Sequence, residues 1–167
     1  MALSQEAELV LQSYFSVAFI IELKNNNFLE SDFYDKMHFG APWIKNLISK
    51  ISIDNQGMLL MCLYAMLVIP KELISNQFKN EYELINKYLL SIAKNTTTTY
   101  KTDKPIINYI RHIRNSVAHS KVEFVQNNYV VFNDKDAKNG NFFRTEIELK
   151  YVGVLLQKLQ NINLLYY

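Results

Sequence analysis

The chain has 167 residues, of which 49% are hydrophobic and 20% are charged. This length and apolar content exclude a disordered chain and fit one domain with a hydrophobic core of its own. Glycine and proline number only 4 and 3, which disfavours a loop-rich or sandwich-like fold and favours long helices. The net charge of +2 is too small to indicate nucleic-acid binding by itself.

The charge is unevenly distributed along the chain. Residues 1–100 carry 8 lysines against 10 acidic residues, whereas residues 101–167 carry 10 basic residues against 6 acidic ones. The three arginines, Arg111, Arg114 and Arg144, all lie in this second part. Because a guanidinium group can bind phosphate through two parallel hydrogen bonds, the second part is where we expect an anion to bind.

The single cysteine, Cys62, excludes an intrachain disulfide and a metal site built from cysteines. It lies in an apolar run, residues 58–69, which predicts a buried and inert thiol in a reducing, cytoplasmic environment. This run has about a dozen residues, too few to cross a bilayer, which takes about 20, so it predicts a buried core helix. The N-terminal segment does not resemble a signal peptide.

Apolar residues recur at helical spacing in the first part of the chain. Ser4 is the expected N-cap of a helix over residues 3–23, and Ser31 is the expected start of a short helix. Proline at the first turn favours a helix from Pro42 to residue 51. Two further helices are expected, a buried one over residues 56–69 that Pro70 ends and a long amphipathic one over residues 73–95.

The period changes after this helical part. Residues 95–103, NTTTTYKTD, have poor helix propensity and are expected to form a loop. A helix should follow, capped by Asp103 with Pro105 in its first turn. Alternating patterns predict three short strands in residues 121–125, 129–133 and 142–149. The predicted fold is mainly α, a single domain with a helical bundle (1–119), a small antiparallel β-meander (120–149) and a C-terminal helix (150–162).

The helix that closes the bundle carries an unusual set of polar residues. Its sequence, IINYIRHIRNSVAHSKVEF over residues 106–124, has an apolar stripe that predicts the face packed on the core: Ile106, Ile110, Ile113 and Val117. The opposite side would carry five polar residues, with Arg114 on the flank: Asn108, Arg111, His112, Asn115 and His119. Such a set can be a plain solvated face. It also supplies a fixed cation, an amide and a group that titrates near neutral pH, which suit phosphate chemistry.

The segment RNSVAH, residues 114–119, resembles the Arg-x4-His motif of the HEPN superfamily, with asparagine directly after the arginine as in its commonest form. The setting is also similar, because the motif closes a late helix and is followed by short strands and a helix. The resemblance implies a HEPN-like helical bundle. It further implies, as for many members, a metal-independent endoribonuclease that acts as a homodimer, with the motif helices of two copies facing each other across a composite site.

The resemblance also implies roles for the motif residues. His119 would activate the 2′-hydroxyl of RNA or protonate the leaving oxygen, Arg114 would hold the scissile phosphate, and Asn115 would orient His119 or the phosphate. No metal or cofactor is needed, because RNA brings its own nucleophile, and the products would carry a 2′,3′-cyclic phosphate. Around these three catalytic residues we expect four substrate-binding residues: Arg111, His112, Lys121 and Asn108.

The biological setting implied by the resemblance is defence or a toxin–antitoxin system, with RNA, a second copy and a cognate antitoxin or nucleotidyltransferase as partners. Toxins of this kind that pair with a nucleotidyltransferase have a tyrosine two residues after the motif histidine, where this chain has Lys121. Tyrosine modification is therefore not available at that position, whereas Lys121 can contact phosphate. Two other readings stay open: a catalytically silent HEPN module that binds RNA, a nucleotide or a protein, and a helical scaffold without a ligand.

Other groupings of reactive residues are weaker. Ser116 lies four residues after His112, but neither an orienting acid nor an oxyanion hole is evident for a hydrolase. Asp32, Asp35 and His38 have a spacing that could flank a metal, but a polar loop is the favoured reading. Aromatic residues of the predicted strands are expected to fill the core of the hairpins rather than stack on bases: Tyr129, Phe132, Phe142 and Phe143.

Overall fold

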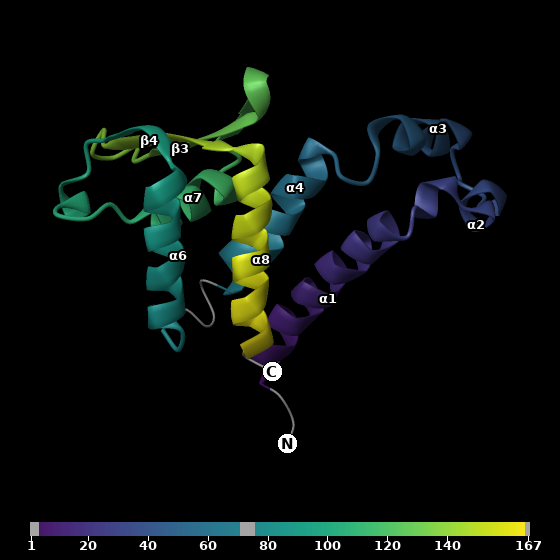
Figure 1. Cartoon of the computed structure of the whole chain (residues 1–167), viewed down its shortest axis with the longest axis horizontal. Helices are drawn as coiled ribbons and strands as arrows, with labels where there is room; N and C mark the ends of the chain where they lie inside the picture. The colour runs from purple at the N-terminus through teal and green to yellow at the C-terminus, as the bar shows by residue number, and fades with distance from the viewer. Residues whose placement is uncertain (1–3, 71–75, 166–167) are drawn as a thin grey trace.

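The computed structural model describes residues 4–70 and 76–165. Over these residues the protein is mainly α-helical with one antiparallel sheet of four strands before the C-terminal helix, as Figure 1 shows. The helices are α1 (Gln5–Asn25), α2 (Asp32–Lys36), α3 (Pro42–Ile51), α4 (Gln56–Leu63), α6 (Lys79–Ile92), α7 (Tyr109–Ala118) and α8 (Leu149–Leu165). The strands are β1 (Lys94–Thr98), β2 (Val122–Val125), β3 (Tyr129–Lys135) and β4 (Phe142–Glu148). The predicted fold class is therefore confirmed.

Local capping sets the starts of the first helices. The Ser4 side chain accepts a hydrogen bond from the backbone N–H of Ala7 at 3.2 Å, and the Ser31 side chain accepts one from the N–H of Tyr34 at 3.1 Å. Pro42 occupies the first turn of α3. Each serine side chain bonds to a backbone N–H that has no partner inside its helix, and proline in the first turn has no N–H that would need one. The predicted starts at these three positions are confirmed.

Two predicted helices differ from the structure. The helix expected over residues 56–69 continues past α4 as a π-helical segment, Tyr64–Val68, and its first half is not buried, since Met61 is 62% exposed. Cys62 is buried as expected, and burial raises the pKa of its thiol. The helix expected over residues 73–95 begins at Lys79, with Phe78 as its N-cap, and ends at Ile92. Residues 73–75 of that prediction lie outside the described residues.

The sheet has one strand more than expected. Residues 95–98, predicted as a loop, belong to β1, which pairs with β4 in the strand order β1-β4-β3-β2. The threonines favour extended backbone, and the hydroxyls of Thr96 and Thr145 lie 2.7 Å apart across the two strands. The partner strand lies far along the chain, so the local pattern could not reveal this pairing.

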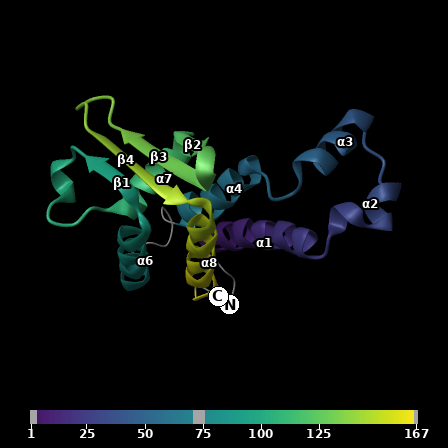
Figure 2. The same ribbon diagram turned by 45° about the horizontal axis from the view of Figure 1, so that its top comes forward.

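The core lies between α7 and the sheet and continues down between α6 and α8. Helix α7 packs against β3, and in Figure 2 it lies behind the strands, with α6 and α8 extending away from the same end of the sheet. The side chains of Ile113, Phe132 and Ile147 are fully buried there. This packing places the end of α7, and with it the motif residues, beside the β3–β4 turn.

The other end of the molecule is an extended arm. The second half of α1, helices α2 and α3 and the start of α4 project away from the sheet (Figure 1). Among the described residues no single helix meets the length and hydropathy of a membrane span. The helices Pro42–Ile51 and Gln56–Val68 reach that length and hydropathy only when they are taken together, and they are bent by 84° relative to each other.

Candidate functional site

Helix α7 begins later than its sequence suggests. Asn108 is its N-cap, and the Asn108 Oδ1 atom accepts a hydrogen bond from the backbone N–H of Arg111 at 3.0 Å. The predicted cap, Asp103, instead lies in a preceding 3-10 turn, with its carboxylate turned into the protein. Ile106 therefore precedes the helix and is 64% exposed, so its predicted place in the core stripe is wrong. The remaining members of the stripe, from Ile110 to Val117, are buried as expected.

The C-terminal end of α7 fixes the position of the motif histidine. His119 is the C-cap, and Ser120 follows with a left-handed φ of 53°. The N–H of Ser120 bonds to the carbonyl of Val117 at 3.2 Å, and the N–H of Lys121 bonds to that of Ser116 at 2.8 Å. These two bonds form a Schellman motif. The chain therefore reverses sharply and leaves the side chains of His119 and Lys121 exposed on either side of Ser120.

An open groove of about 690 Å³ lies beside this helix end. It brings together four of the seven predicted site residues: Arg111, Asn115, His119 and Lys121. The end of β3, the β3–β4 turn and the segment before α7 complete its lining with Tyr100, Asp134, Lys135, Asp136, Ala137 and Lys138. The groove therefore combines lysine and arginine side chains with one exposed imidazole and two carboxylates.

Arg114 and Asn115 form a bonded pair at the edge of this groove. The Arg114 Nε and Nη2 atoms donate to the Asn115 Oδ1 atom at 3.1 and 2.6 Å. The Asn115 Nδ2 atom donates to Asp134 Oδ2 at 3.0 Å. Because its oxygen faces Arg114 and its nitrogen faces Asp134, the orientation of the amide is fixed by both neighbours. Asn115 thus orients Arg114, and no hydrogen bond joins it to the side chain of His119 within the described part of the chain.

His112 lies beneath the groove rather than in it. Its side chain is 0% exposed, so the predicted position on a solvated polar face is wrong. The His112 Nδ1 atom lies 2.7 Å from Asp134 Oδ2, and Nε2 lies 3.0 Å from Asp103 Oδ2. The Arg111 Nη2 atom also contacts Asp103 Oδ1 at 3.1 Å. In this arrangement His112 supports the groove from behind and does not reach a ligand in it.

Two carboxylates and one guanidinium surround the His112 ring. Each ring nitrogen faces a carboxylate, and Nε2 also lies 3.0 Å from Arg111 Nη2. Burial acts to raise the pKa of Asp103, but hydrogen bonds from Thr98 and His112 and the charges of His112 and Arg111 outweigh it, so the pKa lies below its usual value. The two carboxylates, the imidazole and the guanidinium thus form one hydrogen-bonded network, in which each buried polar group has a partner.

Aromatic rings enclose this charge network. The His112 ring stacks on Phe143 with centroids 4.2 Å apart and planes 10° apart, and Tyr100 covers it from a second side at 4.8 Å. The guanidinium of Arg111 lies over the Tyr100 ring at 5.3 Å. Phe132 and Phe143 are buried in the core as predicted, whereas the same prediction is wrong for Phe142, which is 40% exposed. These rings exclude water from His112 while Arg111 and Tyr100 keep one side on the groove.

Three other groupings from the sequence lie outside the motif groove or do not form a site among the described residues. The Ser116 hydroxyl donates to the backbone carbonyl of His112 at 2.7 Å and is fully buried, so it is not paired with the imidazole as a nucleophile. Asn108 lines a different groove, formed with Asn86, Ile106 and neighbouring residues. The described residues contain no group of three or more metal-binding side chains arranged around a common point.

Sequence reasoning missed Asp103, Asp134 and Tyr100. Asp134 carried a usable signal, because Val130, Phe132 and Asp134 alternate along β3 and should share the face that packs on α7. A carboxylate at the third of these positions predicts a buried partner of opposite charge. Asp103 and Tyr100 carried no such signal, because the loop that holds them is positioned by β1, which the local sequence pattern does not predict.

The fold and site define a class of protein: a helical domain with an Arg-x4-His motif at the end of a helix that packs on a small sheet, next to an open, partly basic groove. A family model described as HEPN pEK499 p136 matches residues 1–167. Because the match covers the whole chain, the protein belongs to this HEPN family, and the predicted HEPN membership is confirmed. Comparisons with curated proteins and with solved structures found no match.

Proposed function

We propose that this HEPN protein is a metal-independent endoribonuclease that cleaves RNA by attack of the 2′-hydroxyl, at a composite site formed by two copies of the chain. The observation that carries the proposal is the state of His119. Its imidazole is exposed at the groove and makes no hydrogen bond with any residue in ranges 4–70 and 76–165. A histidine ring that is available in this way can donate a proton to a ligand or accept one from it.

The surrounding residues support phosphate binding. Arg111 and Lys121 line the groove together with the lysines of the β3–β4 turn. Arg114 is held by Asn115, which Asp134 holds in turn, so the guanidinium is pre-oriented before a ligand arrives. A pre-oriented guanidinium loses less rotational freedom when it binds a phosphate oxygen, and it stabilises the charge that develops there.

The proposed chemistry balances without a metal. The 2′-oxygen forms a bond to phosphorus as its proton passes to a base, and the bond from phosphorus to the 5′-oxygen breaks as that oxygen takes a proton from an acid. The products are a 2′,3′-cyclic phosphate and a 5′-hydroxyl. Two proton transfers call for two groups, and the motif of one chain supplies His119 alone. Two copies would supply both histidines, which supports the composite site.

A second candidate is a catalytically silent HEPN module that binds RNA, a nucleotide or a protein. It is favoured by the carboxylates of Asp134 and Asp136, which line the same groove and weaken its attraction for a polyanion. The implied setting, defence or a toxin–antitoxin system with a cognate antitoxin, belongs to the proposal in either form. Cleavage separates the two candidates, because only the enzyme produces cyclic-phosphate ends.

The test is cleavage of end-labelled RNA in EDTA by the wild type, His119→Ala and His38→Ala, with analysis of the product ends. His38 is an exposed histidine on the arm, so its replacement is a matched control for the loss of an imidazole. We expect cyclic-phosphate ends from the wild type and from His38→Ala, and a loss of at least about 100-fold in rate for His119→Ala. Equal cleavage by all three proteins, or cleavage only when a metal is added, would refute the proposal.

A further inference from the structure

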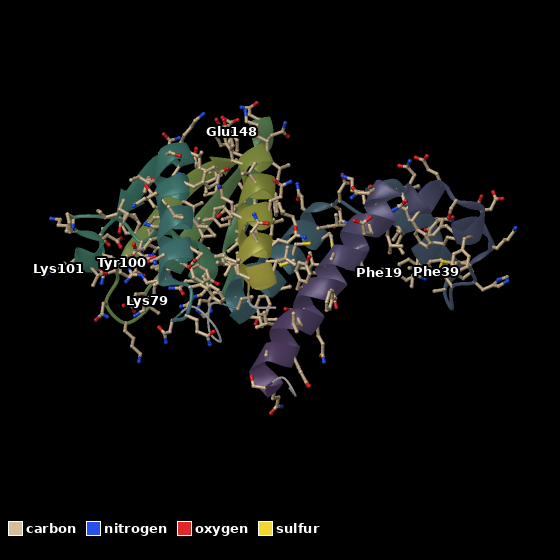
Figure 3. All side chains as sticks on the ribbon, turned by 60° about the horizontal axis from the view of Figure 1, so that its bottom comes forward. Phe19, Phe39, Lys79, Tyr100, Lys101 and Glu148 are labelled. Atoms are coloured by element: carbon tan, nitrogen blue, oxygen red, sulfur yellow. The ribbon has the colours of Figure 1, made fainter. Side chains whose placement is uncertain are left out.

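Tyr100 places an aromatic ring in the lining of the motif groove, where the other lining side chains are mostly charged. It comes directly before the 3-10 turn Lys101–Asp103, and it is only partly buried. Figure 3 shows Tyr100 beside Lys101, at the end of the molecule that is remote from the arm. A tyrosine in such a place presents an apolar ring surface that a ligand can cover.

Neighbouring groups hold the Tyr100 ring in a fixed position. The backbone N–H of Tyr100 donates to the Thr98 hydroxyl at 3.2 Å, and its carbonyl accepts from the N–H of Asp103 at 3.2 Å. The ring packs on the buried His112 with centroids 4.8 Å apart. A ring that is fixed before a ligand arrives loses little freedom when a flat group stacks on it, so less binding energy is lost to ordering.

Arg111 is fixed beside this ring. Its guanidinium lies over the Tyr100 ring at 5.3 Å, and its Nη1 and Nη2 atoms donate to Thr102 Oγ1 and Asp103 Oδ1, each at 3.1 Å. The Arg111 side chain nevertheless stays 32% exposed. Unpaired nucleobases stack both on aromatic rings and on guanidinium planes. Tyr100 and Arg111 together therefore offer a stacking surface at one end of the groove.

We propose that an unpaired RNA base stacks on this Tyr100–Arg111 surface, while the lysines that line the groove bind the phosphates of the same strand. The inference rests on the proposed function, since it assigns a base of the same RNA whose phosphate meets Arg114 and His119. A rise of about 1.5 Å per residue separates Arg111 from His119 by about 12 Å along α7. The stacked base therefore lies beside the reacting atoms and positions the strand, and it takes no part in the chemistry.

The charge at this end of the groove fits a base better than a phosphate. Burial and the charges of Asp134 and Asp136 raise the pKa of the Tyr100 phenol, so the ring stays uncharged at neutral pH. The two carboxylates repel a phosphate, whereas a base carries no charge for them to repel. The carboxylates thus favour a strand that turns a base toward Tyr100 and keeps its phosphates near the lysines.

The groove does not read the edge of the base, because its amide and carboxylate groups are engaged within the chain. The Asp136 carboxylate accepts from the N–H of Lys138 at 2.8 Å and from Asn139 Nδ2 at 2.7 Å. Asn115 Nδ2 donates to Asp134 Oδ2. Edge recognition needs donors and acceptors that are free to pair with the base. The site therefore tolerates any base, but it excludes a duplex, in which the base faces are covered by their neighbours.

The test measures, by fluorescence anisotropy, the binding of fluorescein-labelled oligoadenylate to the wild type, Tyr100→Leu and Tyr64→Leu. The strand carries 2′-O-methyl groups, so it lacks the nucleophile and stays intact whether or not the protein is a nuclease. Tyr64 is 47% exposed and does not line the groove, so its replacement is a matched control for the loss of a tyrosine ring. We expect Tyr100→Leu to weaken binding by about 5- to 100-fold, the effect of one lost stacked base. Tyr64→Leu and Tyr100→Phe should bind like the wild type.

The ligand supplies a second measurement, which does not depend on the folding of a variant. The wild type should bind oligouridylate about as well as oligoadenylate, and should bind an abasic strand or the duplex of the two more weakly. Tyr100→Leu should bind the abasic strand like the wild type. Equal binding of the single strand by the wild type and Tyr100→Leu would overturn the proposal, and so would an equal loss on the abasic strand or tighter binding of the duplex. If RNA is not cleaved but the Tyr100 effect holds, the nuclease is refuted and the stacking surface stands.

Discussion

Replacing His112 with alanine removes the imidazole that lies between two buried carboxylates. The side chains of Asp103 and Asp134 are 1% and 8% exposed. After the substitution Asp103 keeps its hydrogen bonds from Thr98 and Arg111, and Asp134 keeps the one from Asn115. Each carboxylate nevertheless loses its contact with the imidazole, and both are almost fully buried.

The expected loss follows from two contributions. Removing one partner of a buried ion pair typically lowers the free energy of unfolding by about 3–5 kcal/mol, and the remaining partners on each carboxylate favour the lower end. Loss of the ring stacked on Phe143 leaves a cavity and adds about 1–2 kcal/mol. We therefore expect His112→Ala to lower the free energy of unfolding by about 4 kcal/mol, a large part of the 5–15 kcal/mol that is typical of a domain.

The loss should depend on pH in a defined direction. The pKa of Asp103 is lowered in the folded wild type, so its pairing stabilises the fold above the usual value of 3.8 and is lost as the pH falls through the lower, folded value. In the variant, burial still raises this pKa, while the hydrogen bond and charge of His112 that lowered it are gone. The difference between wild type and variant should therefore be largest near pH 7 and shrink below about pH 4.

Urea unfolding at both pH values measures this, with His38→Ala as the control. The control should change the free energy of unfolding by less than about 0.5 kcal/mol, because His38 is exposed. A loss below about 1 kcal/mol for His112→Ala, or a loss that is the same at both pH values, would contradict the charged network described above.

Two further predictions concern the motif itself. Ser120→Gly should raise the free energy of unfolding by about 1 kcal/mol, because glycine adopts the left-handed φ of 53° without strain; an unchanged or lowered midpoint in urea would contradict the strain. Asn115→Ala should slow RNA cleavage by about tenfold, because it removes the hydrogen bonds that orient Arg114. An unchanged rate in the same cleavage assay would show that this orientation does not matter.

Local sequence signals predicted much of the helical part of the fold. Ser4, Ser31 and Pro42 each act on backbone groups within one turn of themselves, so the pattern alone located the starts of α1, α2 and α3. The same holds for the end of the motif helix at His119, where the change from a helical to an alternating period marked the reversal. Signals of this kind depend only on neighbouring residues.

The parts that the sequence did not predict depend on distant residues. β1 forms because β4 pairs with it, about fifty positions later, and the turn after β1 then carries Asp103 to His112. Both carboxylates then lie over α7. The face of this helix that looks polar in the sequence is therefore buried at His112, where the ring bonds to both carboxylates. A histidine and two aspartates can thus be buried when they pair with one another and with an arginine at the groove.

Asp134 links the core to the motif, and this link decides which variants are informative. Its Oδ2 atom accepts hydrogen bonds from both His112 and Asn115. A change at Asp134 therefore acts at once on the buried network and on the orientation of Arg114, so it would lower stability and activity together. Asn115 and His119 line the groove, and neither side chain is fully buried. Variants at these two residues can test the chemistry of the motif without removing the charges that stabilise the core.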